Sequence, residues 1–304
     1  MKAVISDVGI KRRLYWVEEL RKLTGIFGND SDKVENELSA EIKLEGITAL
    51  LDHLRLCGDI PESYAHDSSE EKLYSKYTDT LLCEAYKFMG LKSIVLKERG
   101  DSSDVEAFAK DYAFVADAKS FRLSRTAKNQ KDFKVQAMDG WKRGKPHAMV
   151  VCPIYQLPTK SSQIYEQASA RNVCIFTYSH LAVLVNYSAI DGNAKTEALI
   201  REVFKSVEAL NPSKDASAYW TAINRPMLAF SKHIPDLWKF EKDAAIESIV
   251  IAKEQALTFL AKEREKIMRM TYPEALKELV RTYKIDAKEQ TIRAVCENAI
   301  LSIG

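Results

Sequence analysis

Asp117 and Lys119 stand two residues apart at the end of an apolar stretch, residues 114–116, that is typical of a β-strand. Because alternate side chains of a strand share a face, this spacing predicts that the carboxylate lies beside the ammonium group, with Ala118 turned into the sheet. Asp104 comes thirteen residues before Asp117. If its segment folds back beside this strand, two carboxylates and one lysine converge.

Such a group of side chains suits metal-assisted hydrolysis of a phosphodiester. Asp104, Asp117 and the backbone carbonyl of Ala118 offer the oxygen ligands that Mg²⁺ prefers. The ion would polarise the phosphate and lower the pKa of a bound water. Lys119 would orient that water and neutralise charge in the transition state. We therefore predict Asp104, Asp117 and Lys119 as catalytic residues.

The spacing alone is weak support for this chemistry. An acid two residues before a lysine also occurs at Glu41, Glu70, Asp132 and Asp286. Residues 117–119 differ from these because they end an apolar strand and have an acid upstream. The alternative at this point is a solvated ion pair at a strand end.

A basic segment follows the pair directly. Residues 119–145 carry nine lysines and arginines against two aspartates, a net charge of +7 in a chain whose total is +2. Lys and Arg neutralise phosphates, while Asn, Gln and Arg can read adenine and guanine edges. Such a run is commonly a solvated basic surface, but beside a hydrolytic site it favours DNA binding. The residues predicted to contact DNA are Ser120, Arg122, Ser124, Arg125, Thr126, Lys128, Asn129, Gln130 and Lys131.

The elements that must position these residues follow from hydrophobic periodicity. Helical spacing predicts helices over residues 11–57, about 69–89, 236–270 and about 287–301, with Pro273 at a helix start. Ser68 and Ser69 followed by two glutamates open the second helix, and Gly90 closes it. Short stretches rich in Val, Ile and Phe predict strands of a mixed sheet at residues 93–97, 113–119, 148–152 and 173–178.

These elements predict an α/β fold with a mixed β-sheet core at about residues 65–185. Extensive helical regions are expected on both sides, at about 1–60 and 190–304. We interpret residues 1–304 as one domain. Two domains divided near residue 190 are the alternative, because residues 191–193 form a turn signal.

Composition excludes several classes of protein. The chain is 46% hydrophobic and 29% charged, the balance of a globular protein rather than a disordered one. It lacks the glycine-rich phosphate loop, the dinucleotide fingerprint and the serine nucleophile elbow. No apolar run suits a secretory signal or a membrane span. Five widely spaced cysteines in mostly apolar surroundings are expected to be reduced, which favours the cytoplasm.

The basic segment also carries a resemblance to a known family. Residues 116–134, ADAKSFRLSRTAKNQKDFK, closely resemble a stretch of the HindIII type II restriction endonucleases. Weaker similarity extends through residues 71–79, 99–105 and 162–164. The resemblance therefore covers about residues 65–185.

The resemblance implies a restriction-endonuclease-like fold of the PD-(D/E)xK superfamily, a homodimer and dependence on Mg²⁺. It further implies cleavage of double-stranded DNA at the palindrome AAGCTT, after the first adenine, with 5′ overhangs. Position by position, Asp104 and Asp117 become the two acids of the motif and Lys119 its lysine. Ser103 departs from the pattern, because a proline usually precedes the first acid.

Two further implications concern an additional acid and a partner. A further acid commonly lies on the helix before the core in this superfamily, and Glu71 and Asp79 are the candidates. Either could instead be an exposed helix charge. A restriction enzyme also implies a cognate DNA methyltransferase that protects the host, as a functional rather than a physical partner.

Two other functions stay open. A nuclease of the same fold could read branched or damaged DNA instead of a sequence. A DNA-binding regulator could retain the basic segment without catalysis.

Overall fold

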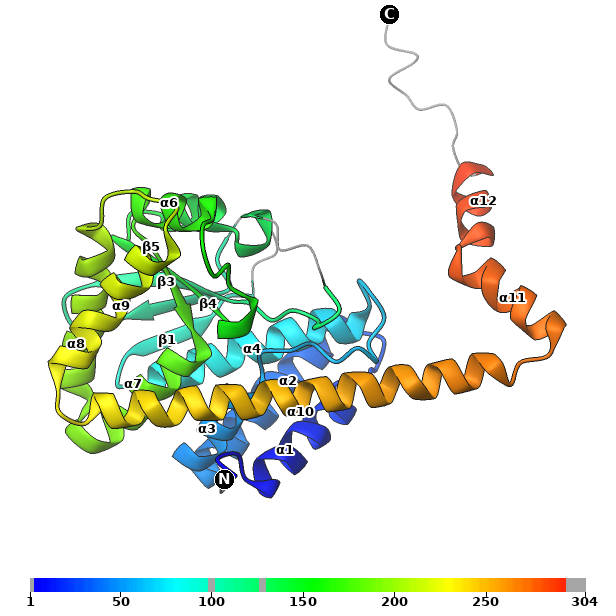
Figure 1. The fold of residues 1–304 in the computed structure, drawn as a ribbon, viewed down its shortest axis with the longest axis horizontal. Helices are drawn as coiled ribbons and strands as arrows, with labels where there is room; N and C mark the ends of the chain where they lie inside the picture. The colour runs from blue at the N-terminus through cyan, green and yellow to red at the C-terminus, as the bar shows by residue number, and fades with distance from the viewer. Residues whose placement is uncertain (1–2, 98–101, 126–129, 294–304) are drawn as a thin grey trace, which may run out of the picture. The chain divides into compact units, whose positions relative to one another are not determined.

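The computed structural model describes residues 3–97, 102–125 and 130–293, with only the backbone at residues 130 and 131 (Figure 1). Two compact units make up the chain, Met1–Ala256 and Leu257–Gly304. The turn at residues 191–193 lies inside the first unit and joins two helices through Gly192, which takes a positive φ of 90°. The single nuclease domain stays a prediction.

The first unit begins with helices, continues through a mixed region and ends with helices. The first helices are α1 (Asp7–Glu19), α2 (Phe27–Glu45), α3 (Ile47–Leu56) and α4 (Ser69–Phe88). The mixed region contains β1 (Lys92–Val95), β2 (Val105–Phe108), β3 (Ala113–Ala118), η1 (Gln130–Phe133), α5 (Val135–Trp141), β4 (His147–Cys152), η2 (Ile154–Gln156), α6 (Gln163–Ala170) and β5 (Val173–Thr177). The last helices are α7 (Tyr178–Asp191), α8 (Asn193–Glu208), α9 (Ala216–Phe230) and α10 (Ile234–Met268), which continues into the second unit. The predicted α/β fold, a mixed sheet between N- and C-terminal helices, is confirmed.

The five strands lie in their sequence order, β1-β2-β3-β4-β5. The pairs β1·β2 and β2·β3 are antiparallel, and the pairs β3·β4 and β4·β5 are parallel. Strand β2 was not predicted, because Glu106 and Ala107, two residue types that are depleted in strands, interrupt its short apolar stretch. Its register pairs Val105 with Ala116, so the preceding Asp104 lies beside Asp117.

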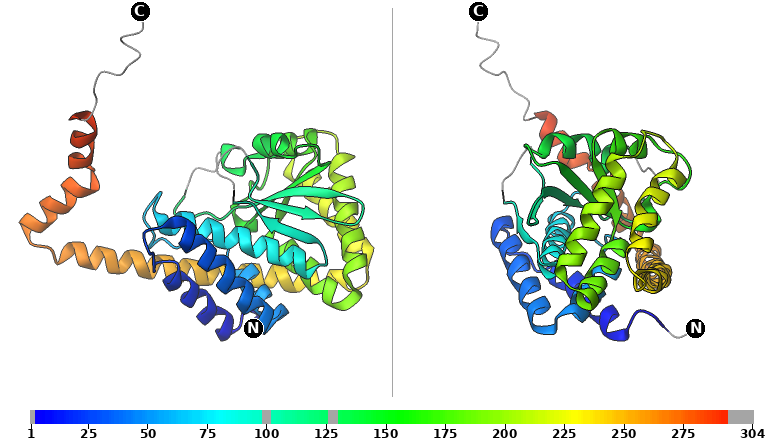
Figure 2. Two further views of the ribbon diagram at one scale, coloured as in Figure 1. Left: turned by 180° about the vertical axis from the view of Figure 1, so that it is seen from behind. Right: turned by 90° about the vertical axis from the view of Figure 1, so that its left-hand side faces the viewer.

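Helix α4 packs across the strands that carry the predicted catalytic residues. The side chain of Ser68 accepts a hydrogen bond from the backbone N–H of Glu71, which caps the first turn as the sequence predicts. Near the other end, the ring of Tyr86 meets Phe114 of β3 edge to face, with centroids 5.1 Å apart. Figure 2 shows α4 and α6 on opposite sides of the sheet. The buried face of α4 therefore fixes its side chains relative to β3.

Arg13 of α1 joins the N-terminal helices to the chain that follows β3. Its buried guanidinium donates to Asp59 Oδ2 at 2.6 Å and to Tyr74 Oη at 3.1 Å. Asp59 in turn forms an isolated parallel bridge with Phe121, two residues after Lys119. This network holds the basic segment against α3 and α4.

The second unit contains the end of α10, α11 (Tyr272–Thr282) and α12 (Ile285–Arg293). The predicted start of α11 is confirmed, since Thr271 and Glu274 cap it reciprocally with Pro273 in its first turn. Residues 294–301 of the last predicted helix lie outside the described residues. Among the helices described, none has both the length and the apolar character needed to span a membrane.

His180 of α7 makes the stability of the first unit depend on pH. Burial lowers the pKa of His180 to about 4, although its Nε2 lies 2.7 Å from the side-chain oxygen of Asn224. Between pH 6.5 and 4 the unfolded chain therefore binds a proton that the folded chain does not bind. We expect the free energy of unfolding to fall by about 2 kcal/mol from this group between pH 7 and pH 5.

Urea unfolding at the two pH values, compared between wild type and His180→Gln, measures this contribution. The variant should lose less stability on acidification than the wild type. His66→Gln, which changes an exposed histidine, serves as the control. An equal loss in the wild type and His180→Gln would contradict the assignment.

Candidate active site

Asp117 and Lys119 form an ion pair at the end of β3. The carboxylate of Asp117 is only 1% exposed, and its Oδ2 pairs with the ammonium of Lys119. The backbone of Lys119 is fixed on both sides. Its N–H donates to the carbonyl of Val151 at 2.7 Å, and its carbonyl accepts from the hydroxyl of Tyr178 at 3.0 Å. These contacts hold the ammonium beside the carboxylate.

Two further aspartates meet this pair from different elements. Asp104 comes from the residue before β2, and Asp79 comes from α4. One carboxylate oxygen of each of Asp79, Asp104 and Asp117 lies within 4.8 Å of the others. The structure therefore brings together both acids of the predicted motif and one of the two candidates for a further acid. We call Asp79, Asp104 and Asp117 the acid cluster.

The pKa values of the three carboxyl groups in the acid cluster are shifted from their ordinary values. Burial, together with repulsion from Asp104, raises the pKa of Asp79 well above its usual range. Burial also raises the pKa of Asp117, although Lys119 opposes this rise. At Asp104, burial is outweighed by the ammonium groups of Lys76, Lys119 and Lys134 together, and the pKa is lowered. Three close carboxylates with differing proton affinities are typical of a functional site.

The acid cluster fits a hard divalent cation. Among the described residues, Oδ1 of Asp117 has no hydrogen-bond partner although it is buried. A buried carboxylate oxygen without a partner is costly, and a cation is the ligand that such an oxygen suits. Ala118 is buried at the end of β3, and its carbonyl stays a predicted ligand.

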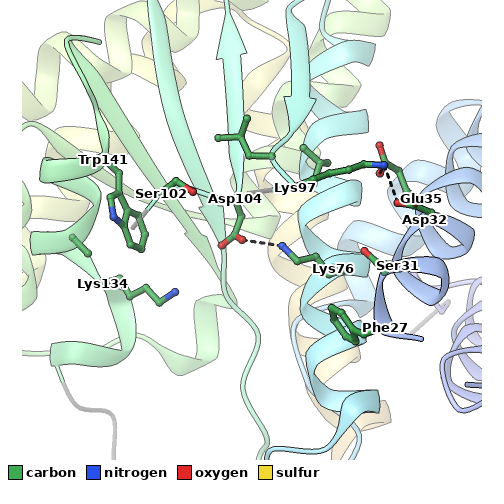
Figure 3. Close-up of a pocket in the computed structure, with 14 residues that line it drawn as sticks. Phe27, Ser31, Asp32, Glu35, Lys76, Lys97, Ser102, Asp104, Lys134 and Trp141 are labelled. Atoms are coloured by element: carbon green, nitrogen blue, oxygen red, sulfur yellow. Dashed lines mark hydrogen bonds and ion pairs between the residues drawn. The ribbon is translucent and has the colours of Figure 1, made fainter. Parts of the chain in front are cut away.

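A cavity of about 630 Å³ opens beside Asp104. Three lysines line it, namely Lys76 of α4, Lys97 after β1 and Lys134 before α5, together with Asp32 and Glu35 of α2. In Figure 3 the side chain of Asp104 lies between Lys76 and Lys134. The cavity therefore opens onto Asp104, one member of the acid cluster.

Lys76 is a residue of the site that was not predicted from the sequence. Its ammonium lies 3.0 Å from Oδ1 of Asp104 and 3.4 Å from Oδ2 of Asp79. Its position three residues before Asp79 on a helix was the available signal. That signal carries little weight, because such pairs are common on exposed helices.

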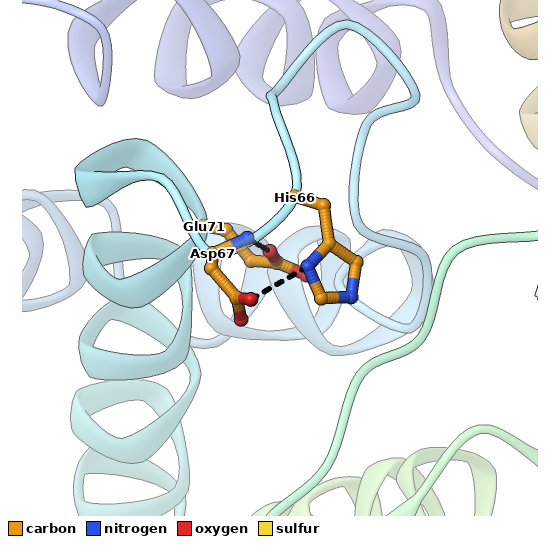
Figure 4. A group of neighbouring side chains, drawn as sticks. All are labelled: His66, Asp67 and Glu71. Carbon is orange, nitrogen blue, oxygen red and sulfur yellow. Dashed lines mark hydrogen bonds and ion pairs between the residues drawn. The ribbon is translucent and has the colours of Figure 1, made fainter. Parts of the chain in front are cut away.

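Glu71 lies apart from the acid cluster. Its carboxylate accepts from the backbone N–H of Asp67 at 2.6 Å and lies 3.3 Å from the guanidinium of Arg122. With His66 and Asp67 it forms a separate, largely exposed group at the start of α4 (Figure 4). Asp79 is therefore the candidate that geometry favours.

The predicted DNA-contacting residues fall into two groups. Ser120 and Arg122 point into the protein, with Ser120 donating to the carbonyl of Cys57 at 2.8 Å and Arg122 donating to the carbonyls of Tyr64 and Ala65 at 3.0 Å. Both side chains have a structural use that the sequence did not reveal.

The second group lies toward the surface. The hydroxyl of Ser124 donates to Glu62 at 2.7 Å, and Arg125 pairs with Asp132 at 2.5 Å while remaining half exposed. Thr126, Lys128 and Asn129 lie outside the described residues, and only the backbone of Gln130 and Lys131 is described.

Comparisons with known proteins bear on this geometry. A sequence model of the HindIII restriction endonuclease family matches residues 14–296. The type II restriction enzyme HindIII of Haemophilus influenzae is 34% identical over 289 residues, covering 90% of this chain and 93% of that enzyme. The similarity therefore extends well beyond residues 65–185 and includes every element that carries the acid cluster.

Proposed function

Because this chain belongs to the HindIII restriction endonuclease family of type II site-specific nucleases, we propose that it cleaves double-stranded DNA at 5′-AAGCTT-3′ after the first adenine. The products would carry 5′-phosphate overhangs. The observation that supports the catalytic part most strongly is the acid cluster beside Lys119, next to a basic segment of the chain. The choice of sequence rests on the relative alone.

The proposed roles follow from the chemistry of each side chain. Asp104, Asp117 and the carbonyl of Ala118 would hold Mg²⁺, with Asp79 as the further acid. What Mg²⁺ supplies when bound is neutralisation of the phosphate charge and a lower pKa for water. Lys119 orients the attacking water and stabilises the negative charge that develops on the phosphate. Water then displaces the 3′ oxygen from phosphorus in line.

A palindromic substrate matches a two-fold symmetric enzyme. Each subunit of a homodimer would present one site to one strand, so both strands are cut. The enzyme is expected to act in the cytoplasm. There, a cognate methyltransferase would protect the same sequence in the host DNA.

Digestion of a sequenced linear DNA, with and without Mg²⁺, followed by sequencing of the ends, tests this function. We expect Mg²⁺-dependent cuts at AAGCTT with an AGCT overhang. Discrete cuts at another sequence would retain the nuclease and refute the proposed specificity. Cleavage of branched DNA alone would favour a structure-specific nuclease, and tight binding without any cleavage would favour a regulator.

Substitutions of Arg125 and Arg122 can be compared to locate DNA contacts. We propose that Arg125 contacts a phosphate, because its guanidinium is half exposed, whereas Arg122 is engaged by two backbone carbonyls. Arg125→Ala should weaken binding to all DNA sequences and reduce the slope of log affinity against log salt by about 1. Arg122→Ala should leave this slope unchanged. A gel-shift titration at several salt concentrations measures it, and equal slopes for Arg125→Ala and wild type would refute the contact.

A further inference from the structure

The ammonium of Lys76 is paired with two carboxylates of the acid cluster in the metal-free protein. Its ammonium lies 3.0 Å from Asp104 and 3.4 Å from Asp79, so it bridges two of the three carboxylates. Lys119 pairs with the third, Asp117. The acid cluster therefore has one ammonium for the Asp79–Asp104 side and one for Asp117.

The surroundings of Lys76 allow its ammonium to leave. The backbone of Lys76 is fixed in α4, where the nearby residues Tyr74 and Tyr77 are buried. Its side chain, however, is 27% exposed and lines the 630 Å³ cavity. A flexible four-carbon stem can move the charge into this cavity without any change in the helix. Lys119, with 12% of its side chain exposed, has less freedom.

A divalent cation and Lys76 would compete for the carboxylates of Asp79 and Asp104. A metal ion held by Asp104 and Asp79 would lie within a few ångströms of the ammonium, and like charges at that distance repel strongly in a partly buried site. We propose that Lys76 is a resident counter-cation that competes with the divalent metal for Asp79 and Asp104 and thereby sets the metal concentration that the enzyme requires. This inference rests on the proposed metal site.

The ion pairs of Lys76 also have a structural role in the metal-free protein. Without Lys76, Asp79 and Asp104 would lose the ammonium that bridges them. With Lys76 the acid cluster stays assembled until the metal arrives. Lys76 is thus a positioning residue, acting through the two carboxylates.

Binding of Mn²⁺ to the DNA-free protein tests this inference without any cleavage. Electron paramagnetic resonance of the free aquo ion gives the bound fraction directly. Lys76→Met and Lys76→Gln both remove the charge, and each should bind Mn²⁺ on the order of tenfold more tightly than the wild type. Lys76→Arg keeps the charge and should stay close to the wild type. Agreement between the Met and Gln variants separates charge from packing.

Lys87→Met is the matched control, because Lys87 lies on the same helix and also pairs with an acid three residues away, Glu84, at 2.8 Å. It should bind Mn²⁺ as the wild type does. The Mg²⁺ concentration for half-maximal cleavage should fall for the two charge-removing variants and not for Lys87→Met.

The outcomes separate this inference from the proposed function. Unchanged or weaker Mn²⁺ binding in Lys76→Met and Lys76→Gln, with wild-type binding that Asp117→Asn abolishes, would overturn the role of Lys76 and leave the metal site intact. Wild-type binding that Asp117→Asn does not weaken would overturn the metal site itself, and the competition with it.

Discussion

Asp117→Asn is expected to lower the rate of DNA cleavage on the order of 10³-fold or more while the protein stays folded and binds DNA. The substitution keeps the shape of the side chain but removes the negative charge that would hold the metal beside the scissile phosphate. Single-turnover cleavage measures the rate, and a gel shift measures binding. Asp117 is buried within the acid cluster, so solvent water cannot take the place of the lost carboxylate as a metal ligand.

Asp111→Asn is the matched control for this loss. Asp111 lies six residues earlier in the chain, where it is exposed and pairs with Arg201 at 2.9 Å. We expect it to cleave DNA at the wild-type rate. Wild-type cleavage by Asp117→Asn would refute the assigned site, whereas equal losses in the two variants would point to a general effect of lost charge.

Arg13→Met is expected to destabilise the first unit by about 3–5 kcal/mol, because it leaves the buried carboxylate of Asp59 without its cation. Burial raises the pKa of Asp59 even with Arg13 in place. The variant also removes a donor from the carbonyl of Leu56. Thermal unfolding should shift downward by roughly 10 °C.

The effect of Arg13→Met should reach the active site through the bridge between Asp59 and Phe121. Cleavage by the folded variant should therefore also be reduced. Arg21→Met changes an exposed arginine on the same stretch of chain, which pairs with Glu18 at 3.0 Å. It should alter stability by less than about 1 kcal/mol. A similar small change for Arg13→Met would contradict the structural role of the buried pair.

The fold could be predicted where local signals were strong. The serine cap, acidic first turn and closing glycine delimit α4 to within a residue or two. Strands β3, β4 and β5 are apolar on both faces, and helices cover the sheet on both sides, so each reads as an apolar run. Strand β2 was not predicted, because Glu106 and Ala107 interrupt its short apolar stretch. Its existence depends on pairing with β1 and β3, which no local pattern encodes.

The candidate site was only partly predictable for a related reason. The spacing of Asp117 and Lys119 follows from strand geometry, and the position of Asp104 required only that its segment fold back. The choice between Glu71 and Asp79 required the rotation of α4 against the sheet, which tertiary packing sets. Arg122 was predicted to contact DNA from its charge, and the sequence does not show its partners in the fold, the carbonyls of residues 64 and 65.

Anomalous scattering from Mn²⁺ in crystals of the protein tests the proposed metal site directly, because it locates the metal without reference to activity. We expect a peak among the carboxylates of Asp79, Asp104 and Asp117. A peak at the separate group formed by His66, Asp67 and Glu71, with none at the acid cluster, would contradict the proposed site.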